Sequence, residues 1–240
     1  MAQKLAEALK VNVVVENKAG GSGVVGTQAM ATAPADGYTW AMVFDTHGVN
    51  SSLIANMPYD SKKDLVPLIL VGTSAMLLAT HVGSEYKSFA DVVAAAKAQK
   101  TVSFGTVGNG SLGHLAMALL GKDANVEWTH IPYKGGPPAI ADLISGQVNM
   151  MFINMPTGIT HVRSGKAKII AVSSIKRVSQ LPDVPTVDQA GVKGFETSAW
   201  SGLYAPAGTP VDIINRLNAE VVKILKQPSV KDQLMAQGAE

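Results

Sequence analysis

One stretch near the middle of the chain, residues 102–116, constrains the fold most, because three kinds of local structure follow one another within it. Residues 102–106 are an apolar, strand-prone run, residues 107–111 are a loop of small residues, and apolar residues recur at helical spacing from Leu112 onward. We expect Gly121 to end that helix. The glycines let a ligand approach the main chain, and the helix start offers unpaired N–H donors. The stretch therefore predicts an anion-binding loop, and an ordinary strand–helix turn without a ligand is the alternative.

The same alternation of strands and helices recurs along the whole chain and predicts an α/β fold. Residues 11–15 are nearly all valine, which is typical of a buried parallel strand. A second glycine-rich loop, residues 16–23, follows that run. Further strands are expected at 38–44, 65–71, 76–80, 126–131, 149–153, 168–172 and 200–204. Helices are expected at 2–9, 24–33, 88–99, 138–145, 154–163 and 210–226. Ser88 and Asp91 resemble a capping box at the start of the third, and Thr209 is the expected N-cap of the last.

Composition excludes several classes of function. Hydrophobic residues make up 47% of the 240 residues, enough for a large core, and no apolar run is long enough to span a bilayer. The formal net charge is +2 and the Lys and Arg residues are scattered, so we expect no nucleic-acid partner. The chain has no cysteine and no metal-binding histidine spacing. We therefore expect no metal and no cofactor.

Two catalytic or cofactor motifs are only partly present. Residues 108–113 satisfy G-x-G-x-x-G, but the next expected strand ends without the carboxylate that a dinucleotide ribose requires. Ser111 lacks the G-x-S-x-G frame of a hydrolase nucleophile, because Asn109 stands at the first glycine position. No residues assemble a nucleophile with a base, so we expect no catalytic residues.

Polar residues follow several of the expected strands. Asp45 and Thr46 come directly after the strand at 38–44, where ligands bind in open α/β sheets; a helix cap is the alternative. Tyr133 follows the strand at 126–131 and offers a hydroxyl group and a ring. His114 lies one turn into the central helix, where packing or capping is the alternative to ligand binding.

Six ordered motifs then suggest a family. They are V-E-N-K-A-G-G-S-G at 15–23, D-G-Y-T at 36–39, the run at 105–116, Y-K-G with P-A at 133–139, P-D-V-P-T at 182–186 and A-P-A-G-T-P at 205–210. Together they resemble the substrate-binding receptors of tripartite tricarboxylate transporters, the Bug family of periplasmic solute-binding proteins. The resemblance covers nearly the whole chain.

The resemblance implies a two-lobed, type II-like Venus-flytrap fold in which each lobe is a mostly parallel sheet flanked by helices. Lobe one would comprise residues 1–78 and 172–240, and lobe two residues 79–171, with hinge strands near 77–80 and 169–172. The resemblance also implies a monomeric periplasmic protein, with its signal peptide removed, that binds a small organic carboxylate in a cleft. Its partners would be membrane transporter subunits.

The sequence departs from the family pattern in two ways. It starts after the family's first strand and P-P-G-G loop and stops before the last helices, so we expect part of the pocket wall to lie outside it. Ile153 stands where family members often carry Asp, which favours a plain mono- or dicarboxylate over an amino acid. Asp45 could replace that carboxylate, so amino acids stay possible.

We therefore predict an extracytoplasmic receptor for a mono-, di- or tricarboxylate. A transferase-like enzyme and a ligand-sensing domain are the alternatives on the same fold. The predicted ligand-binding residues are Gly20, Gly21, Ser22, Asp45, Thr46, Thr106, Gly108, Gly110, Ser111, His114, Tyr133 and Asn154.

Overall fold

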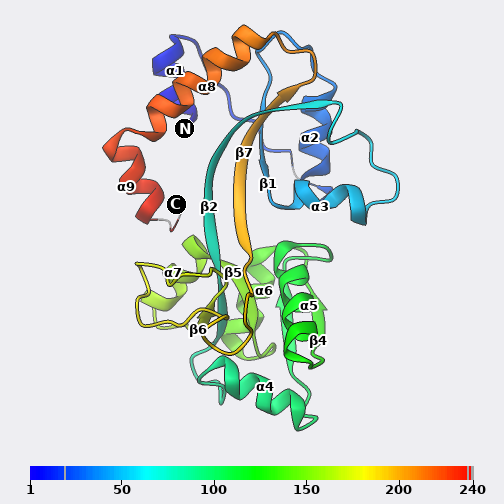
Figure 1. Cartoon of the computed structure of the whole chain (residues 1–240), viewed down its shortest axis with the longest axis vertical. Helices are drawn as coiled ribbons and strands as arrows, with labels where there is room; N and C mark the ends of the chain where they lie inside the picture. The colour runs from blue at the N-terminus through cyan, green and yellow to red at the C-terminus, as the bar shows by residue number, and fades with distance from the viewer. Residues whose placement is uncertain (19, 237, 239–240) are drawn as a thin grey trace. The chain divides into compact units, whose positions relative to one another are not determined.

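The computed structural model describes residues 1–18, 20–236 and 238, and Ala19 of the expected second loop lies outside them. The chain is α/β and divides into two compact units, coloured along the chain in Figure 1. Unit 1 comprises Met1–Thr73 and Trp200–Met235, and unit 2 comprises Ser74–Ala199 together with Ala236, the last residue of helix α9 (Pro228–Ala236), and Gly238. The lobe boundaries expected after residues 78 and 171 both fall inside unit 2.

Unit 2 is built on a sheet whose parallel strands share one edge. The strands are the second part of β2 (Leu65–His81), β3 (Ser103–Thr106), β4 (Thr129–Pro132), β5 (Met151–Asn154) and β6 (Ala167–Val172). β3 pairs in parallel with β4 and forms a parallel bridge to the start of β5, whereas β2 pairs antiparallel with β5 and β6. The carboxyl ends of β3, β4 and β5 therefore lie at the same edge.

Helices follow each of those three parallel strands. They are α5 (Leu112–Ala124), α6 (Gly136–Ser145) and α7 (Met155–Arg163). A further helix, α4 (Phe89–Lys97), begins with the capping box that the sequence predicts: Ser88 accepts from the Asp91 N–H and Asp91 accepts from the Ser88 N–H. The N-termini of α5, α6 and α7 thus follow the one edge at which the parallel strands end.

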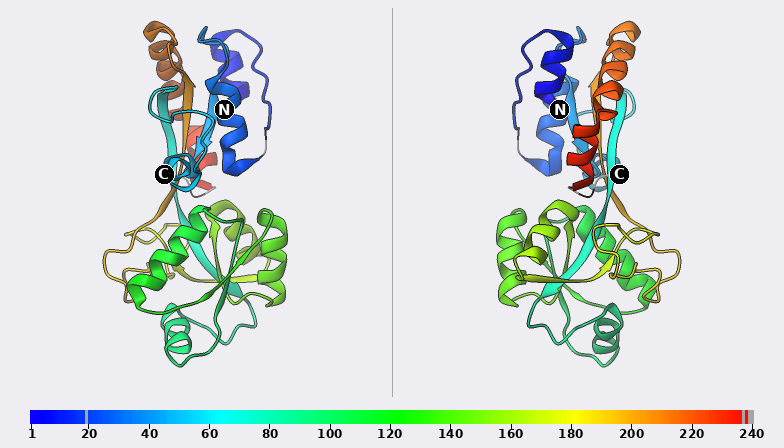
Figure 2. Two further views of the ribbon diagram at one scale, coloured as in Figure 1. Left: turned by 90° about the vertical axis from the view of Figure 1, so that its right-hand side faces the viewer. Right: turned by 90° about the vertical axis from the view of Figure 1, so that its left-hand side faces the viewer.

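Helices cover both faces of the unit 2 sheet, as the two side views show (Figure 2). Along β2, Met76 and Leu78 belong to one core, which they share with residues of α4 and α5. The alternate residues Leu77 and Ala79 belong to a second core, shared with α6 and α7. All four are buried, since side chains alternate across a strand and neither face of this sheet is solvated.

Unit 1 contains three strands and the remaining helices. Their bounds are α1 (Ala2–Leu9), the 3₁₀ helix η1 (Gly21–Gly23), α2 (Val24–Ala31), β1 (Ala41–Phe44), α3 (Thr46–Leu53), the first part of β2, β7 (Ser198–Pro206), α8 (Val211–Leu225) and α9 (Pro228–Ala236). β7 lies between β1 and β2. Leu5 of α1 packs with Leu217 and Val221 of α8 on Leu203 of β7. None of the described helices has the length and hydropathy needed to cross a membrane.

The expected strand at residues 11–15 is wrong. No described strand pairs with this run, and Val14 and Val15 are 80% and 67% exposed. A parallel arrangement of strands was also expected in this part of the chain, but β1 pairs antiparallel with β7. A valine-rich run becomes a strand only when a neighbour supplies hydrogen-bond partners.

The two strands expected at 65–71 and 76–80 are one continuous strand, β2. The main chain stays extended through the intervening residues, and Gly72 has no positive φ. β2 contains the boundary between Thr73 and Ser74, and β7 contains the one between Ala199 and Trp200. The strands that pass between the units are therefore β2 and β7, and the hinge expected in β6 lies within unit 2.

Two helix ends also differ from expectation. Gly121 does not stop α5, which continues to Ala124 and closes on Asn125 in the left-handed conformation. A side chain at Gly121 would meet the Trp128 ring nitrogen at 2.8 Å, so this glycine serves close packing. Thr209 is not the N-cap of α8, because its hydroxyl donates to the Pro206 carbonyl and Pro210 occupies the cap.

Candidate functional site

The loop between β3 and α5 forms as the sequence predicts, and its shape depends on two glycines. Gly108 and Gly110 have φ values of 138° and 74°, which side-chain-bearing residues rarely adopt. Ser111 is extended and caps α5, since its hydroxyl oxygen accepts from the His114 N–H at 3.4 Å. The loop therefore turns the chain from the sheet edge directly into a helix N-terminus.

Most polar groups of this loop form hydrogen bonds within the protein, and their predicted role as direct ligand donors stays a prediction. The Gly108 N–H donates to the Thr106 hydroxyl, and the Ser111 N–H and hydroxyl both donate to the Gly108 carbonyl. The Gly110 N–H donates to the His114 ring. Thr106 is itself buried, with 1% exposure. These residues shape the loop, and their donors are already used.

The main-chain N–H donors of α5 that have no partner within the described residues come directly after Ser111. Within the described residues, the main-chain N–H groups of Leu112 and Gly113 have no hydrogen-bond partner. They are the first two helical positions, where the N–H groups and the positive end of the helix dipole point out of the helix. A side chain at Gly113 would meet the Phe152 carbonyl oxygen at 3.3 Å, so this first turn lies against β5.

Asn154 lies at the end of β5 and is the N-cap of α7. Its side chain is exposed and makes no hydrogen bond within the part of the chain that the structure describes. It pairs with Met76 of β2, and Pro156 in the first turn of α7 has no N–H to donate. Asn154 therefore has a side-chain amide without a partner among the described residues, and its role in ligand binding stays a prediction.

Tyr133 does not offer its hydroxyl proton to a ligand, because that proton is donated to Asp142 of α6 at 2.7 Å. Burial, the hydrogen bond and the charge of Asp142, in that order, raise the pKa of Tyr133 to about 12. Its N–H donates to the Thr106 carbonyl. Tyr133 thus connects the loop after β4 to α6 and to β3.

His114 faces another histidine. Its ring stacks on that of His130 of β4, with 4.0 Å between the ring centroids, and His130 contacts the Thr106 hydroxyl at 2.7 Å. The His114 Nδ1 atom is engaged by Gly110 at 3.1 Å. His114, which the sequence analysis names as a ligand-binding residue, therefore forms a hydrogen bond to the loop within the protein.

In unit 1, the second glycine-rich loop is also held by hydrogen bonds from a neighbouring helix. Gly20, Gly21, Ser22 and Gly23 all have positive φ, and all are exposed. The Ser22 carbonyl accepts from the Thr46 hydroxyl at 3.0 Å, and a second bond comes from α3. Unit 1 thus brings the predicted residues Gly20, Gly21, Ser22 and Thr46 together.

Asp45 precedes α3 and is half-buried, but its side chain does not cap that helix. Burial raises the pKa of the Asp45 carboxyl, and main-chain hydrogen bonds from Thr46 and from Asp45 itself oppose this in part. A carboxylate here adds negative charge next to Thr46, a predicted ligand-binding residue. Among the described residues, no group of three or more acidic or histidine side chains could hold a metal ion.

Three supporting residues escaped prediction from the sequence. Asn50, which is 2% exposed, donates to the Ser22 carbonyl at 3.1 Å, and His130 and Asp142 hold the loops of unit 2. Asn50 lies one helical turn after Thr46, so the i, i+4 spacing was an available signal. His130 and Asp142 carried none, because their partners come from other elements.

These features define a class of protein. A chain of two α/β units, in which β2 and β7 contain the boundaries and helix N-termini follow parallel strands at one sheet edge, has the two-lobed fold of periplasmic solute-binding proteins. The family model of the tripartite tricarboxylate transporter family receptor matches residues 1–240. The chain belongs to this family of receptors.

Relatives of known structure or name support the same assignment. Protein BugT of Bordetella pertussis is 36% identical over 242 residues, covering 100% of this chain and 74% of BugT. The structure of Rpa4515 from R. palustris with adipate has a TM-score of 0.93 and 33% identity, covering 100% of this chain and 81% of that one. MatC from Rhodopseudomonas palustris with bound malate has a TM-score of 0.88 and 30% identity, covering 99% and 82%.

Proposed function

We propose that this chain is an extracytoplasmic receptor that binds a small organic carboxylate and delivers it to membrane transporter subunits. One observation carries the proposal: the N–H groups of Leu112 and Gly113 have no partner among the described residues, and the first turn of α5 packs against Phe152, two residues before Asn154 with its free side-chain amide. Main-chain N–H groups at a helix start and a side-chain amide are suitable donors for carboxylate oxygens.

The relatives support a dicarboxylate as the first ligand to test. Rpa4515 was solved with adipate and MatC with malate, and both ligands carry two carboxylate groups. Asp45 carries a carboxyl group that could pair with an ammonium group, but Ile153, next to Asn154, carries no charge for this purpose. We therefore place dicarboxylates ahead of amino acids, and we retain Gly20, Gly21 and Ser22 of unit 1 as further candidate donors.

We propose that binding involves no chemical conversion. The Ser111 hydroxyl donates to the Gly108 carbonyl and not to a base, so the residues near the start of α5 contain no activated nucleophile. Incubation of each bound acid with the protein, followed by mass spectrometry, should recover the acid unchanged. Accumulation of a product would favour the transferase-like alternative.

We propose further that the protein is periplasmic and monomeric. Cell fractionation of the source organism should place it in the periplasmic fraction, and light scattering should give one copy of the chain. A stable dimer would contradict the monomer, and a cytoplasmic protein would favour the ligand-sensing alternative.

A thermal-shift panel tests the function itself. The panel contains adipate, malate, mono- and tricarboxylates, amino acids and the uncharged diamide of adipic acid. A ligand at 100 times its dissociation constant stabilises the folded protein by about 2.7 kcal/mol, which raises the melting temperature measurably. A shift with at least one carboxylate but not with the diamide is expected. No shift with any acid would contradict the proposal.

A further inference from the structure

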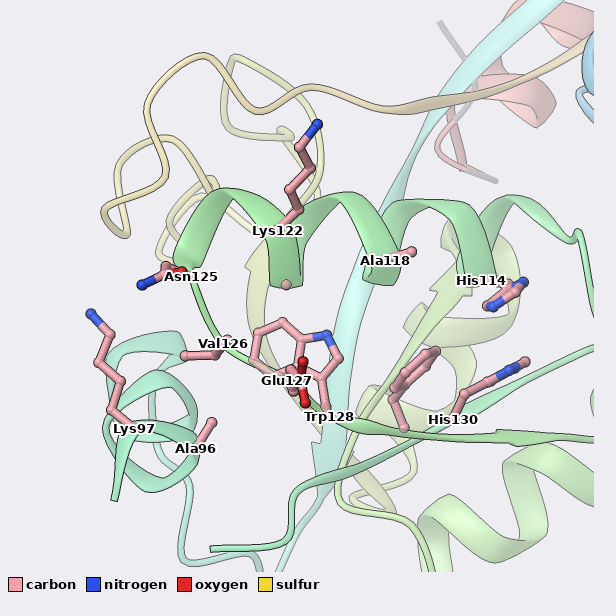
Figure 3. Close-up of a pocket in the computed structure, with 12 residues that line it drawn as sticks. Ala96, Lys97, His114, Ala118, Lys122, Asn125, Val126, Glu127, Trp128 and His130 are labelled. Atoms are coloured by element: carbon pink, nitrogen blue, oxygen red, sulfur yellow. The ribbon is translucent and has the colours of Figure 1, made fainter. Parts of the chain in front are cut away.

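The two stacked histidines of unit 2 each hold one part of the β3–α5 loop. The His114 and His130 rings are inclined by 12° with 4.0 Å between centroids, and Figure 3 shows one directly above the other. Phe104 also stacks with His130, with 4.8 Å between the ring centroids. His130 Nε2 contacts the Thr106 hydroxyl at the loop's start, and His114 Nδ1 accepts from the Gly110 N–H near its end.

The hydrogen bond from Gly110 shows which ring nitrogen of neutral His114 carries the hydrogen. A ring nitrogen that accepts an N–H must carry a lone pair, so the neutral ring has its hydrogen on Nε2. Protonation of Nδ1 would place two N–H groups against each other at a distance of 3.1 Å. The Gly110 N–H would then lose its acceptor, and the loop would lose the hydrogen bond that fixes this glycine at φ 74°.

The pair lies at the edge of a groove, and both rings are partly exposed. The two rings line a groove of about 830 Å³, together with Lys97 of α4, Lys122 of α5 and Glu127 before β4 (Figure 3). His114 lies in the first turn of α5, at the positive end of the helix dipole. Burial, and to a lesser extent the neighbouring His114, lower the pKa of His130.

We propose that His114 is a positioning residue, which in its neutral form holds the Gly110 N–H and keeps the start of α5 in the ligand-binding conformation. Protonation of His114 at Nδ1 would remove this hydrogen bond, release the loop and lower carboxylate affinity. The inference rests on the proposed function, because it concerns the loop that leads to Leu112 and Gly113.

NMR spectroscopy tests the positioning role without any ligand. In the intact protein, the Gly110 amide resonance should shift with pH together with the His114 ring nitrogens, which should report the Nε2–H tautomer at neutral pH. In His114→Ala the Gly110 amide should exchange with solvent faster and lose its pH-dependent shift. An unchanged Gly110 amide in a folded His114→Ala protein would overturn the positioning role, whether or not a carboxylate binds.

Calorimetry with adipate and malate between pH 5 and 8 tests the consequence for binding. His114→Asn keeps an acceptor at the position of Nδ1 but cannot be protonated there, so it should bind as wild type does at pH 8. At pH 5 the wild type should bind roughly three- to tenfold more weakly than His114→Asn, the effect of one hydrogen bond. Comparison at equal pH removes the contribution of the ligand's own protonation.

His161→Asn is the matched control, because His161 lies in the last turn of α7 and makes no side-chain hydrogen bond within the described residues. It should retain the wild-type pH profile. If wild-type affinity rose on acidification, His114 would be a direct partner of the carboxylate and the inference would be wrong. If neither protein bound adipate or malate at any pH, the proposed function would fail for these acids, and the NMR result would still decide the role of His114.

Discussion

The phenolic oxygen of Tyr133 donates a hydrogen bond to Oδ2 of Asp142 across 2.7 Å, joining the loop after β4 to α6. Because of this bond, the hydroxyl proton of Tyr133 is already donated within the protein, and Tyr133 stabilises the loop at the sheet edge. Its N–H is also committed, to the Thr106 carbonyl at 3.0 Å. The loops after β3 and β4 are therefore held to each other, and the free donors lie at the start of α5 and at Asn154.

Tyr133→Phe should destabilise unit 2. Loss of a hydrogen bond to a carboxylate costs about 1–2 kcal/mol, and thermal unfolding at pH 7 should report it. The pKa is raised from 10.0 to about 12, so this stabilisation is fully present below pH 10 and declines as the pH rises toward 12. The exposed Tyr38→Phe is the control and should change nothing. Equal melting temperatures for Tyr133→Phe and wild type would contradict the assigned bond.

Leu112→Pro should weaken carboxylate binding by about 10- to 100-fold, the effect of one charge-assisted hydrogen bond. Proline is tolerated at the first helical position, and Ser111, with φ −64° and ψ 156°, already has the conformation that a following proline requires. The substitution therefore removes the N–H while leaving the helix intact.

Two controls accompany that calorimetric measurement. Leu112→Ala loses the same side chain but keeps the N–H, and Val211→Pro places proline at the first position of α8 in unit 1. Both should bind adipate or malate as the wild type does. Wild-type affinity in a folded Leu112→Pro protein would remove the start of α5 from the site.

Asp45→Asn should stabilise the protein near neutral pH. Burial raises the pKa of this carboxyl in the folded state, so the ionised form destabilises folding at neutral pH. The gain should be largest above the folded-state pKa and should vanish as the pH falls below the ordinary value of 3.8, where both states are protonated. Chemical denaturation as a function of pH measures this, with exposed Asp123→Asn as the control. A gain that grew on acidification would have the wrong sign.

Thr46→Val should loosen the glycine-rich loop of unit 1. The variant keeps the shape of the side chain but removes the hydroxyl that donates to the Ser22 carbonyl, which should cost about 1 kcal/mol. Thr32→Val removes a comparable hydroxyl bond, from the exposed residue directly after α2 to the Gln28 carbonyl, and is the matched control. Unfolding and adipate titration should be measured together. Reduced stability with unchanged affinity would exclude this loop from ligand binding.

Much of the fold followed from local patterns. The β3–loop–α5 sequence, the Ser88 capping box and the helical spacing of α8 were predicted because the residues that determine each lie within one or two turns of each other. The glycine-rich loops were predicted because Gly108 and Gly110 adopt positive φ at little cost.

The sequence predicted which loops form the candidate site, but it did not predict which N–H groups in them are free to bind a ligand. The sequence indicated donors at Ser111 and Gly110, whereas the structure uses both internally and leaves free those of Leu112 and Gly113. The partner of Thr106 is His130, which lies 24 residues away. Hydrogen bonds between elements depend on how those elements pack, which no local pattern encodes.

The sequence by itself determined where the helices start, where the chain turns and which loops follow strands, since capping, φ preference and hydrophobic period act over a few residues. Only the tertiary structure decided that residues 11–15 form no strand with any part of the described chain, that β2 runs unbroken from one unit into the other and which of the described N–H groups remain free. Each of these depends on whether a partner from a distant part of the chain is present, because a strand or a donor is satisfied only by a neighbour in space.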